Sequence, residues 1–219
     1  MNFGRSFVEV TKIYYRLADK IISDIEIIGE DNYQKARAKN KGIIFISGHC
    51  GNWELLATAF GVRISPAAGV ARAQNNPYLN SLLEKARYRY GNRIIYKKGA
   101  LKGILSELKK NRTVSILMDQ AVIKEEGFII DFLGRGAWTT KMPALLARKT
   151  GAPVLSAFIH RSNGRHVITI NPEIELSHDE DTEKAVIEDT KKLTGLIEDY
   201  IKQHPTEWLW IHRRWKRVD

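Results

Sequence analysis

Apolar runs and amphipathic segments alternate along most of the chain. GIIFIS (42–47) is rich in branched apolar residues and is typical of a strand buried on both faces of a sheet. HVITINPEIEL (166–176) alternates between apolar and polar residues, which predicts an edge or antiparallel strand. The predicted strands are 42–47, 65–72, 92–98, 113–120, 152–160 and 166–176.

The segments between these runs carry apolar residues at helical spacing. In residues 52–61, Asn52 is a candidate N-cap and Gly61 a candidate end of the helix. The predicted helices are 52–61, 76–91, 100–111, 141–151 and 181–203. Strands separated by helices predict an α/β fold in which helices flank a mixed, mostly parallel central sheet.

An amphipathic helix is predicted over about residues 4–22. Its apolar and basic positions interleave: Phe7, Val10, Tyr14, Leu17 and Ile21 with Arg5, Lys12, Arg16 and Lys20. Such a helix suits the surface of an anionic membrane, but it also suits covering the sheet. Both interpretations stay open at this point.

Length and charge narrow the picture. A chain of 219 residues with 43% hydrophobic and 27% charged residues predicts one globular domain, 1–219. The apolar runs are shorter than the roughly 18 residues of a membrane span, and the N-terminus has no signal-peptide pattern. The net charge of +10 favours anionic partners. Cys50 is the only cysteine, so no disulfide forms within the chain, and a reducing compartment is expected.

Three predicted strands run into polar side chains. GIIFIS (42–47) runs into His49, AAGVA (67–71) into Arg72 and TVSILM (113–118) into Asp119. In open α/β sheets, ligands bind beyond the carboxyl ends of the strands. We therefore expect these three side chains to share one edge of the sheet and to form a site there.

The segment SGHCGNWELLA (47–57) places Glu54 five residues after His49. The two side chains can meet only if His49 lies in a turn before the helix, which Gly48 and Gly51 permit. A carboxylate on one ring nitrogen would leave the other nitrogen free as a base. Alternatively, His49 only caps the helix and Glu54 only favours the positive end of the helix dipole.

Several segments, in consistent order from about residue 40 onward, resemble the bacterial lipid A late acyltransferases, a branch of the glycerolipid acyltransferase superfamily. SGHCGNWELL resembles the family's motif of a histidine, four residues and an acid. The other matching segments are ARAQNNPYLNSLLEKARYRYG, SILMDQ, FLGRGAWTTKMPALLARKTGAPVLSAFIHR and PTEWLWIHRRWK.

The resemblance implies transfer of a fatty acyl chain from a thioester donor to a hydroxyl of a membrane glycolipid, without a cofactor. His49 would be the general base and Glu54 would orient it. Arg72 and Asp119 match essential family residues. Arg72 or backbone N–H groups near Gly51 are candidates to stabilise the oxyanion. The family also implies the glycerolipid acyltransferase fold for the sheet and helices described above.

The expected donor is acyl carrier protein and the expected acceptor a lipid A precursor at the cytoplasmic face of the bacterial inner membrane. The alternatives are acyl-CoA with another glycolipid, such as a phosphatidylinositol mannoside, and a catalytically silent lipid-binding relative. Family members usually begin with a membrane-spanning helix. We therefore expect either a shortened form or a peripheral protein held by helix 4–22. The sequence gives no indication of the oligomeric state.

Further residues are candidates for substrate binding. From the family motifs these are Gly51, Asn52, Trp53 and Gln120; from positive charge they are Arg87, Arg89, Arg213 and Arg214. The arginines of segment 84–93 alternatively form a solvated face. The tail WLWIHRRWKR (208–217) either anchors its tryptophans in the core or contacts membrane headgroups. No nucleic-acid-binding motif is present, so no such partner is expected.

Three features weigh little in this interpretation. Cys50 adjoins His49, but adjacent side chains point in different directions, so a cysteine nucleophile is not expected. The remaining histidines have no metal-ligand spacing, so no metal is expected, and we assign His212 a structural hydrogen bond. Met142 stands where the family often has glycine, which affects the acyl pocket or local packing. The histidines without metal-ligand spacing are His160, His166, His178, His204 and His212.

Overall fold

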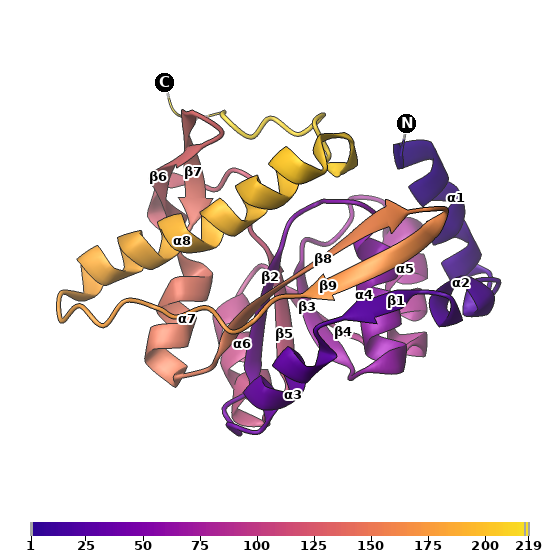
Figure 1. Cartoon of the computed structure of the whole chain (residues 1–219), viewed down its shortest axis with the longest axis horizontal. Coiled ribbons are helices and arrows are strands. Elements are labelled where there is room, and N and C mark those ends of the chain that lie inside the picture. The colour runs from indigo at the N-terminus through magenta and orange to yellow at the C-terminus, as the bar shows by residue number, and fades with distance from the viewer. Residues whose placement is uncertain (1, 217, 219) are drawn as a thin grey trace.

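A seven-stranded sheet forms the centre of the molecule in a computed structural model that describes residues 2–216 and 218 (Figure 1). Its strand order is β1-β9-β8-β2-β5-β3-β4. Neighbours are parallel except β8 and β9, so the predicted mostly parallel sheet is confirmed. The strands are β1 (Glu26–Ile28), β2 (Ile43–Ser47), β3 (Ala67–Ala71), β4 (Arg93–Tyr96), β5 (Thr113–Leu117), β8 (Val154–Ser162) and β9 (Arg165–Ile170).

Eight α-helices surround the sheet in the described part of the chain, joined by two short 3-10 helices. The helices predicted in the interior of the chain are confirmed, with boundaries shifted by a few residues. The bounds are α1 (Asn2–Tyr14), α2 (Asp19–Ser23), α3 (Glu30–Arg37), α4 (Trp53–Arg63), α5 (Pro77–Arg89), α6 (Ala100–Lys109), α7 (Met142–Thr150), α8 (Thr182–Gln203), η1 (Lys124–Glu126) and η2 (Pro205–Glu207).

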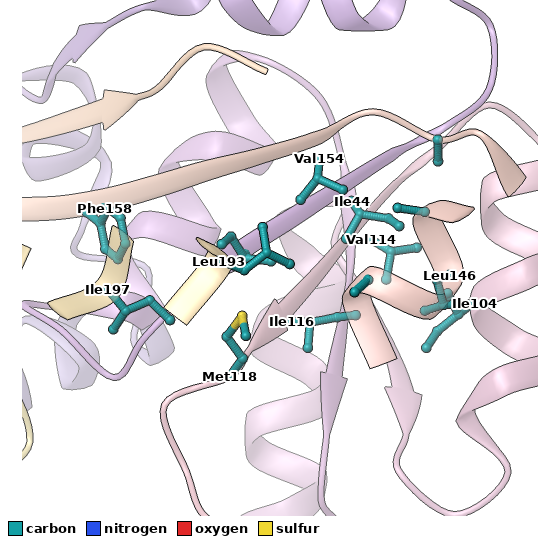
Figure 2. Close-up of a cluster of buried hydrophobic side chains, with 14 of the residues drawn as sticks. Ile44, Ile104, Val114, Ile116, Met118, Leu146, Val154, Phe158, Leu193 and Ile197 are labelled. Atoms are coloured by element: carbon teal, nitrogen blue, oxygen red, sulfur yellow. The ribbon is translucent and has the colours of Figure 1, made fainter. Parts of the chain in front are cut away.

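The two faces of the sheet contribute to two hydrophobic clusters. Along β2, Ile44 and Ile46 belong to the cluster beneath α6, α7 and α8, whereas Ile43 and Phe45 belong to the cluster beneath α3 and α4. This follows from the period of two along a strand. Figure 2 shows the first cluster, in which strand residues such as Ile44 approach helix residues such as Leu193. Burial on both faces explains the unbroken apolar run of β2.

The N-terminal segment departs from the prediction of one helix over residues 4–22. It forms α1 and α2, which are separate helices. Arg16 between them adopts a left-handed backbone conformation with φ of 64°, which interrupts a right-handed helix. The continuous amphipathic pattern did not reveal this break.

Two further boundaries differ from the prediction. Gly61 does not end α4, which continues to Arg63; a Cβ at Gly61 would lie 2.5 Å from Oδ1 of Asn92, so close packing requires glycine there. Strand β9 is antiparallel to β8 as predicted, but it ends at Ile170 instead of 176, and β1 lies outside it.

The sequence pattern missed a hairpin formed by β6 (Gly127–Phe132) and β7 (Arg135–Thr140). Leu133 and Gly134 connect the strands, with φ of 56° and 81°. Positive φ at both central residues is the requirement of a tight hairpin turn, and leucine rarely signals it. The hairpin packs against α8 and stands apart from the main sheet (Figure 1).

Strand β1 and helix α3 were also missed, because both are too short to show a clear period. None of the described helices is both long enough and apolar enough to cross a lipid bilayer.

Candidate active site

The carboxyl ends of β2, β5 and β3 meet at one edge of the sheet. These three strands are adjacent and parallel. His49 follows β2, Asp119 follows β5 and Arg72 follows β3, so the predicted gathering of these residues at one edge is confirmed. His49 and Arg72 line a cavity of about 740 Å³, and Asp119 lies buried behind His49. This placement makes the edge the leading candidate for an active site.

His49 lies in the turn between β2 and α4, as its flanking glycines predicted. Gly51 has φ of 56°, and a Cβ there would lie 2.1 Å from the carbonyl oxygen of Ile159. The N–H of Gly51 donates to the carbonyl of Glu207 at 2.8 Å, and the N–H of Leu209 donates to the carbonyl of His49 at 3.0 Å. The C-terminal segment therefore holds the histidine turn in place from the outside.

Asp119 is the hydrogen-bond partner of the His49 ring. Its Oδ1 lies 2.8 Å from Nδ1 of His49, and its Oδ2 accepts the His49 backbone N–H at 2.9 Å. The indole Nε1–H of Trp208 also donates to Oδ2 at 2.9 Å. Burial raises the pKa of Asp119, but the hydrogen bonds from His49 and Trp208, together with the charge of His49, outweigh burial and lower it. The site thus holds a buried carboxylate against the imidazole.

A carboxylate on Nδ1 keeps the proton on that nitrogen and leaves Nε2 with a free lone pair. The amide nitrogen of Gln120 lies 3.2 Å from Nε2 and 3.4 Å from Nδ1, which places it against the face of the ring and leaves the lone pair of Nε2 open. The Trp53 ring meets the imidazole edge-on, with ring centroids 5.0 Å apart and an interplanar angle of 70°. The geometry presents Nε2 as a base at the wall of the cavity.

Glu54 does not contact His49, contrary to the expectation that it orients the ring. Its carboxylate pairs with Arg87 of α5, with Nη2–Oε1 and Nε–Oε2 distances of 2.5 and 3.2 Å. The first turn of α4 directs Glu54 toward α5, while Asp119 already occupies Nδ1 of His49. Burial and the charge of Glu54 raise the pKa of the neighbouring Tyr14. Glu54 is therefore half of an ion pair in the cavity wall.

Other predicted site residues divide into two groups. Trp53, Arg72, Arg87 and Gln120 line the cavity, whereas Gly51, Asn52, Arg89, Arg213 and Arg214 are absent from its lining. Met142, at the start of α7, is also in the lining, so its side chain affects the shape of the cavity as well as the local packing.

Asn52 is buried and structural, not substrate-binding as predicted. Its Oδ1 accepts the N–H of Leu55 at 3.1 Å, which confirms it as the N-cap of α4. Its Nδ2 donates to Glu9 of α1 at 2.9 Å. Gly51 is likewise buried, and its N–H is occupied by Glu207, so it cannot serve the oxyanion as suggested.

The structure corrects the predicted substrate contact of Arg214, whereas the contacts predicted for Arg89 and Arg213 stay predictions. Arg214 is completely buried. It donates to the carbonyl of Trp138 at 2.6 Å, and its guanidinium carbon lies 4.6 Å from the centre of the Phe132 ring. Burial lowers the pKa of Arg214 to about 10. Arg89 donates to the carbonyl of Tyr14 at 3.0 Å, and Arg213 is exposed. Arg217 of the tail lies outside the described residues.

Cys50 is buried and pairs with Trp208 through a backbone bridge. Burial, and then the charges of Asp119 and Glu207, raise the pKa of its thiol, so the nucleophilic thiolate is disfavoured. This environment agrees with the expectation that Cys50 is not a nucleophile.

The sequence did not identify two residues of the C-terminal tail that line the cavity, His212 and Lys216. The only sequence signal for these two residues was their position in the segment PTEWLWIHRRWK, which resembles a family motif. The structural hydrogen bond expected for His212 is not made by its buried Nδ1, which has no partner among the described residues.

The cavity lining combines polar and apolar side chains. The apolar lining comes from α4 and from β2, β3 and β5, and includes Phe45, Leu56, Phe60, Ala67, Val70 and Ile116. A cavity that joins a base to apolar lining fits a ligand with a reactive head and a hydrocarbon chain.

A family model and several known proteins match this chain, and all of them are described as acyltransferases. A model of the family described as bacterial lipid A biosynthesis acyltransferase matches residues 1–217. Over 218 residues, the chain is 26% identical to a lipid A biosynthesis palmitoleoyltransferase of Escherichia coli strain K12, covering 98% of this chain and 69% of that protein. It is 28% identical over 220 residues to a lipid A biosynthesis lauroyltransferase of the same strain, with the same coverage. A phosphatidylinositol mannoside acyltransferase of Mycobacterium tuberculosis strain H37Rv is 24% identical over 221 residues, covering 98% of this chain and 68% of that protein.

Proposed function

Because this chain belongs to the bacterial lipid A biosynthesis acyltransferase family, we propose that it moves a fatty acyl chain from acyl carrier protein to a hydroxyl of a lipid A precursor. The chain is an acyltransferase, and its relatives support a glycolipid acceptor. The observation that carries the proposal is the pairing of His49 with buried Asp119 at the wall of a cavity of about 740 Å³.

The reaction needs one proton transfer and one acyl transfer. Nε2 of His49 takes the proton of the acceptor hydroxyl, and the hydroxyl oxygen attacks the thioester carbonyl carbon. The oxyanion then collapses and the carbon–sulfur bond breaks. The leaving thiolate takes up the proton held by His49. Asp119 stabilises the protonated imidazole. A thioester is already activated, so no acyl-enzyme is required, in keeping with the buried thiol of Cys50.

The apolar part of the cavity lining accommodates the acyl chain. Each buried CH₂ contributes about 0.8 kcal/mol, so an apolar cleft beside the base positions the chain while leaving the thioester near His49. Met142 lies in the lining, and its side chain would limit the space available to the chain.

Charge supports acyl carrier protein as donor. Acyl carrier proteins are acidic, and this chain carries a net charge of +10. Lys97, Lys98 and Lys102 lie at the carboxyl edge of the sheet, after β4 and at the start of α6, and Lys97 lines the cavity. Lys97 forms an ion pair with Glu126 at 2.7 Å, so the positive charge offered to the donor comes mainly from Lys98 and Lys102.

A second candidate is acyl-CoA-dependent acylation of a phosphatidylinositol mannoside, favoured by the similarity to the mycobacterial acyltransferase. A silent lipid-binding relative is the third. The paired His49 and Asp119 support an active enzyme over the silent alternative.

The acceptor lipid resides in a bilayer, so we place the protein at the cytoplasmic face of the inner membrane with the cavity mouth toward the lipid. Glu9 of α1 contacts Asn52 beside the histidine turn, which puts this part of α1 at the same edge. Phe7 and Val8 are exposed on α1, and Trp210 and Ile211 are exposed on the tail. These apolar side chains support contact with the membrane interface.

The deciding experiment incubates the purified chain with labelled acyl carrier protein or acyl-CoA and a panel of glycolipid acceptors, followed by lipid chromatography. We expect a labelled product with acyl carrier protein and a lipid A precursor, and none with the His49→Gln variant. Product only with acyl-CoA and the mannoside would establish the second candidate. No product with any pair would favour the silent one.

A further inference from the structure

The C-terminal tail contributes one wall of the cavity. His212 and Lys216 line it together with His49 and Gln120. The tail is anchored on both sides of His212. Trp208 donates to Asp119, and the buried Arg214 donates to the carbonyl of Trp138 and to the hydroxyl of Thr139. The position of His212 is therefore set by buried contacts and not by a free chain end.

Three backbone N–H groups of the histidine turn are already engaged in hydrogen bonds. The N–H of His49 donates to Asp119 at 2.9 Å and that of Cys50 to the carbonyl of Gly48 at 2.8 Å. The N–H of Gly51 donates to the carbonyl of Glu207 at 2.8 Å. Acyl-transfer enzymes usually stabilise the oxyanion with such groups. With these three occupied, the donors that remain are the N–H groups in the first turn of α4 and the side chains of the cavity wall.

Side chains in the cavity wall are the alternative donors. The Gln120 amide nitrogen lies against the face of the His49 ring, 3.2 Å from Nε2 and 3.4 Å from Nδ1. Arg72 is exposed at the end of β3, where water screens its charge. His212 is partly buried and lines the cavity together with His49. Its Nδ1 is shielded from solvent and has no partner among the described residues, so the proton of a neutral ring is better placed on Nε2.

The state of the His212 ring suits donation. Burial, followed by the nearby charge of Lys216, lowers its pKa, so the ring is neutral at pH 7 and carries one N–H. The lowered pKa also makes the His212 ring a weaker base than an ordinary imidazole, which disfavours its taking the proton of the hydroxyl. Lys216 adds positive charge to the same wall.

We propose that His212 is a further catalytic residue, which donates a ring N–H to the thioester carbonyl oxygen as that oxygen becomes an oxyanion. The hydrogen bond forms when the acceptor oxygen attacks, and it weakens when the carbon–sulfur bond breaks and the carbonyl is restored. No net proton is transferred by His212. This inference rests on the proposed acyl transfer.

The test compares steady-state rates of the full chain carrying His212→Ala, His212→Gln or His178→Ala, with the donor and acceptor identified above. His178 is exposed and serves as the matched control. Removing one oxyanion donor costs roughly 10²–10³ in kcat. We expect this loss in kcat for His212→Ala, a KM within about threefold of wild type, and at least tenfold recovery in His212→Gln, whose amide can donate.

Several results would overturn the proposal. They are a loss under about fivefold in His212→Ala, equal losses in the alanine and glutamine variants, or a raised KM with unchanged kcat. Thermal unfolding is measured for every variant. If His212→Ala does not fold, the kcat of a folded His212→Gln is compared with that of wild type. A loss of kcat under about tenfold supports donation, and a loss above about 10² opposes it. Absence of transfer by the wild type would instead contradict the acyl-transfer function itself.

Discussion

Nδ1 of His49 lies 2.8 Å from Oδ1 of Asp119, although 70 residues separate them in the chain. The two residues follow the adjacent parallel strands β2 and β5, so the sheet brings them together. The sequence motif instead paired His49 with Glu54, which the structure joins to Arg87. The consequences of this exchange of partners are testable.

The first prediction concerns the base and its carboxylate. His49→Ala should abolish detectable transfer, because removing a positioned general base typically costs about 10²–10⁴ in rate. Asp119→Asn should lower kcat within the same range, since an amide favours the wrong tautomer of the ring. Steady-state rates and circular dichroism measure activity and folding. Asp31→Asn, at an exposed position on α3, is the matched control. Near-normal turnover by His49→Ala would refute the mechanism.

The second prediction separates Glu54 from His49. The side chains of Glu54 and Arg87 are 20% and 26% exposed, so breaking this largely buried pair should lower the free energy of unfolding by about 1–3 kcal/mol. Glu54→Ala should strongly lower the transfer rate, and Arg87→Ala should lower it by a similar factor. In the double variant the losses should not add, because the two residues act as one unit. Urea unfolding and rates for the full cycle measure this. Additive losses would show that Glu54 acts independently of Arg87, and the exposed pair Lys20–Asp24 provides a control cycle.

The third prediction concerns acid stability. Glu9 accepts hydrogen bonds from His166, Arg161 and Asn52. Burial raises its pKa, but these hydrogen bonds and the charges of His166 and Arg161 outweigh burial and lower it to about 2. A lowered carboxyl pKa stabilises the fold fully above the ordinary pKa of 4.5, and the contribution disappears as pH falls toward 2. The contribution at pH 7 is on the order of 2–3 kcal/mol.

Glu9→Gln should therefore destabilise the protein most at neutral pH, and the difference from wild type should shrink below about pH 4.5. Urea unfolding at a series of pH values measures this difference. Glu125→Gln, at an exposed position on η1, should show no comparable dependence. A difference independent of pH would mean that the charge of Glu9 contributes nothing to the docking of α1.

The fourth prediction concerns the donor. The rate at limiting acyl carrier protein should fall as salt rises, because screening weakens association between oppositely charged surfaces. Lys98→Glu and Lys102→Glu should raise the KM for acyl carrier protein. Lys109→Glu, at the opposite end of α6, should not. Insensitivity to salt combined with equal use of acyl-CoA would favour the acyl-CoA alternative.

The fifth prediction concerns the membrane. Phe7→Asp and Ile211→Asp should each weaken sedimentation with anionic vesicles, because both remove exposed apolar surface near the site and add negative charge. Ile28→Asp is the control, since Ile28 is exposed at the end of β1, which runs antiparallel to β8 and so ends at the other edge of the sheet. If the wild type stays in the supernatant at low salt, membrane contact does not arise from these surfaces.

Local patterns in the sequence determined the strands and helices of the central sheet and the edge at which the site lies. Buried parallel strands leave unbroken apolar runs such as 42–47, and a polar residue after such a run marks the carboxyl edge. The N-cap role of Asn52 was also readable, because capping depends on residues within one helical turn. The break at Arg16 and the β6–β7 hairpin were not, since their turns use residues that seldom adopt positive φ.

Only the tertiary structure decided which charged groups are partners. His49 bonds to Asp119, Glu54 to Arg87 and Asn52 to Glu9, each across a long separation in sequence. It also decided that Arg214 is buried while His212, two residues earlier, faces the cavity. Hydrogen bonding and burial depend on distances between segments, which a sequence pattern does not contain. The sequence therefore determined which residues gather at the edge, and the packing of α4 on α5 and of the tail on the histidine turn determined what each of them does there.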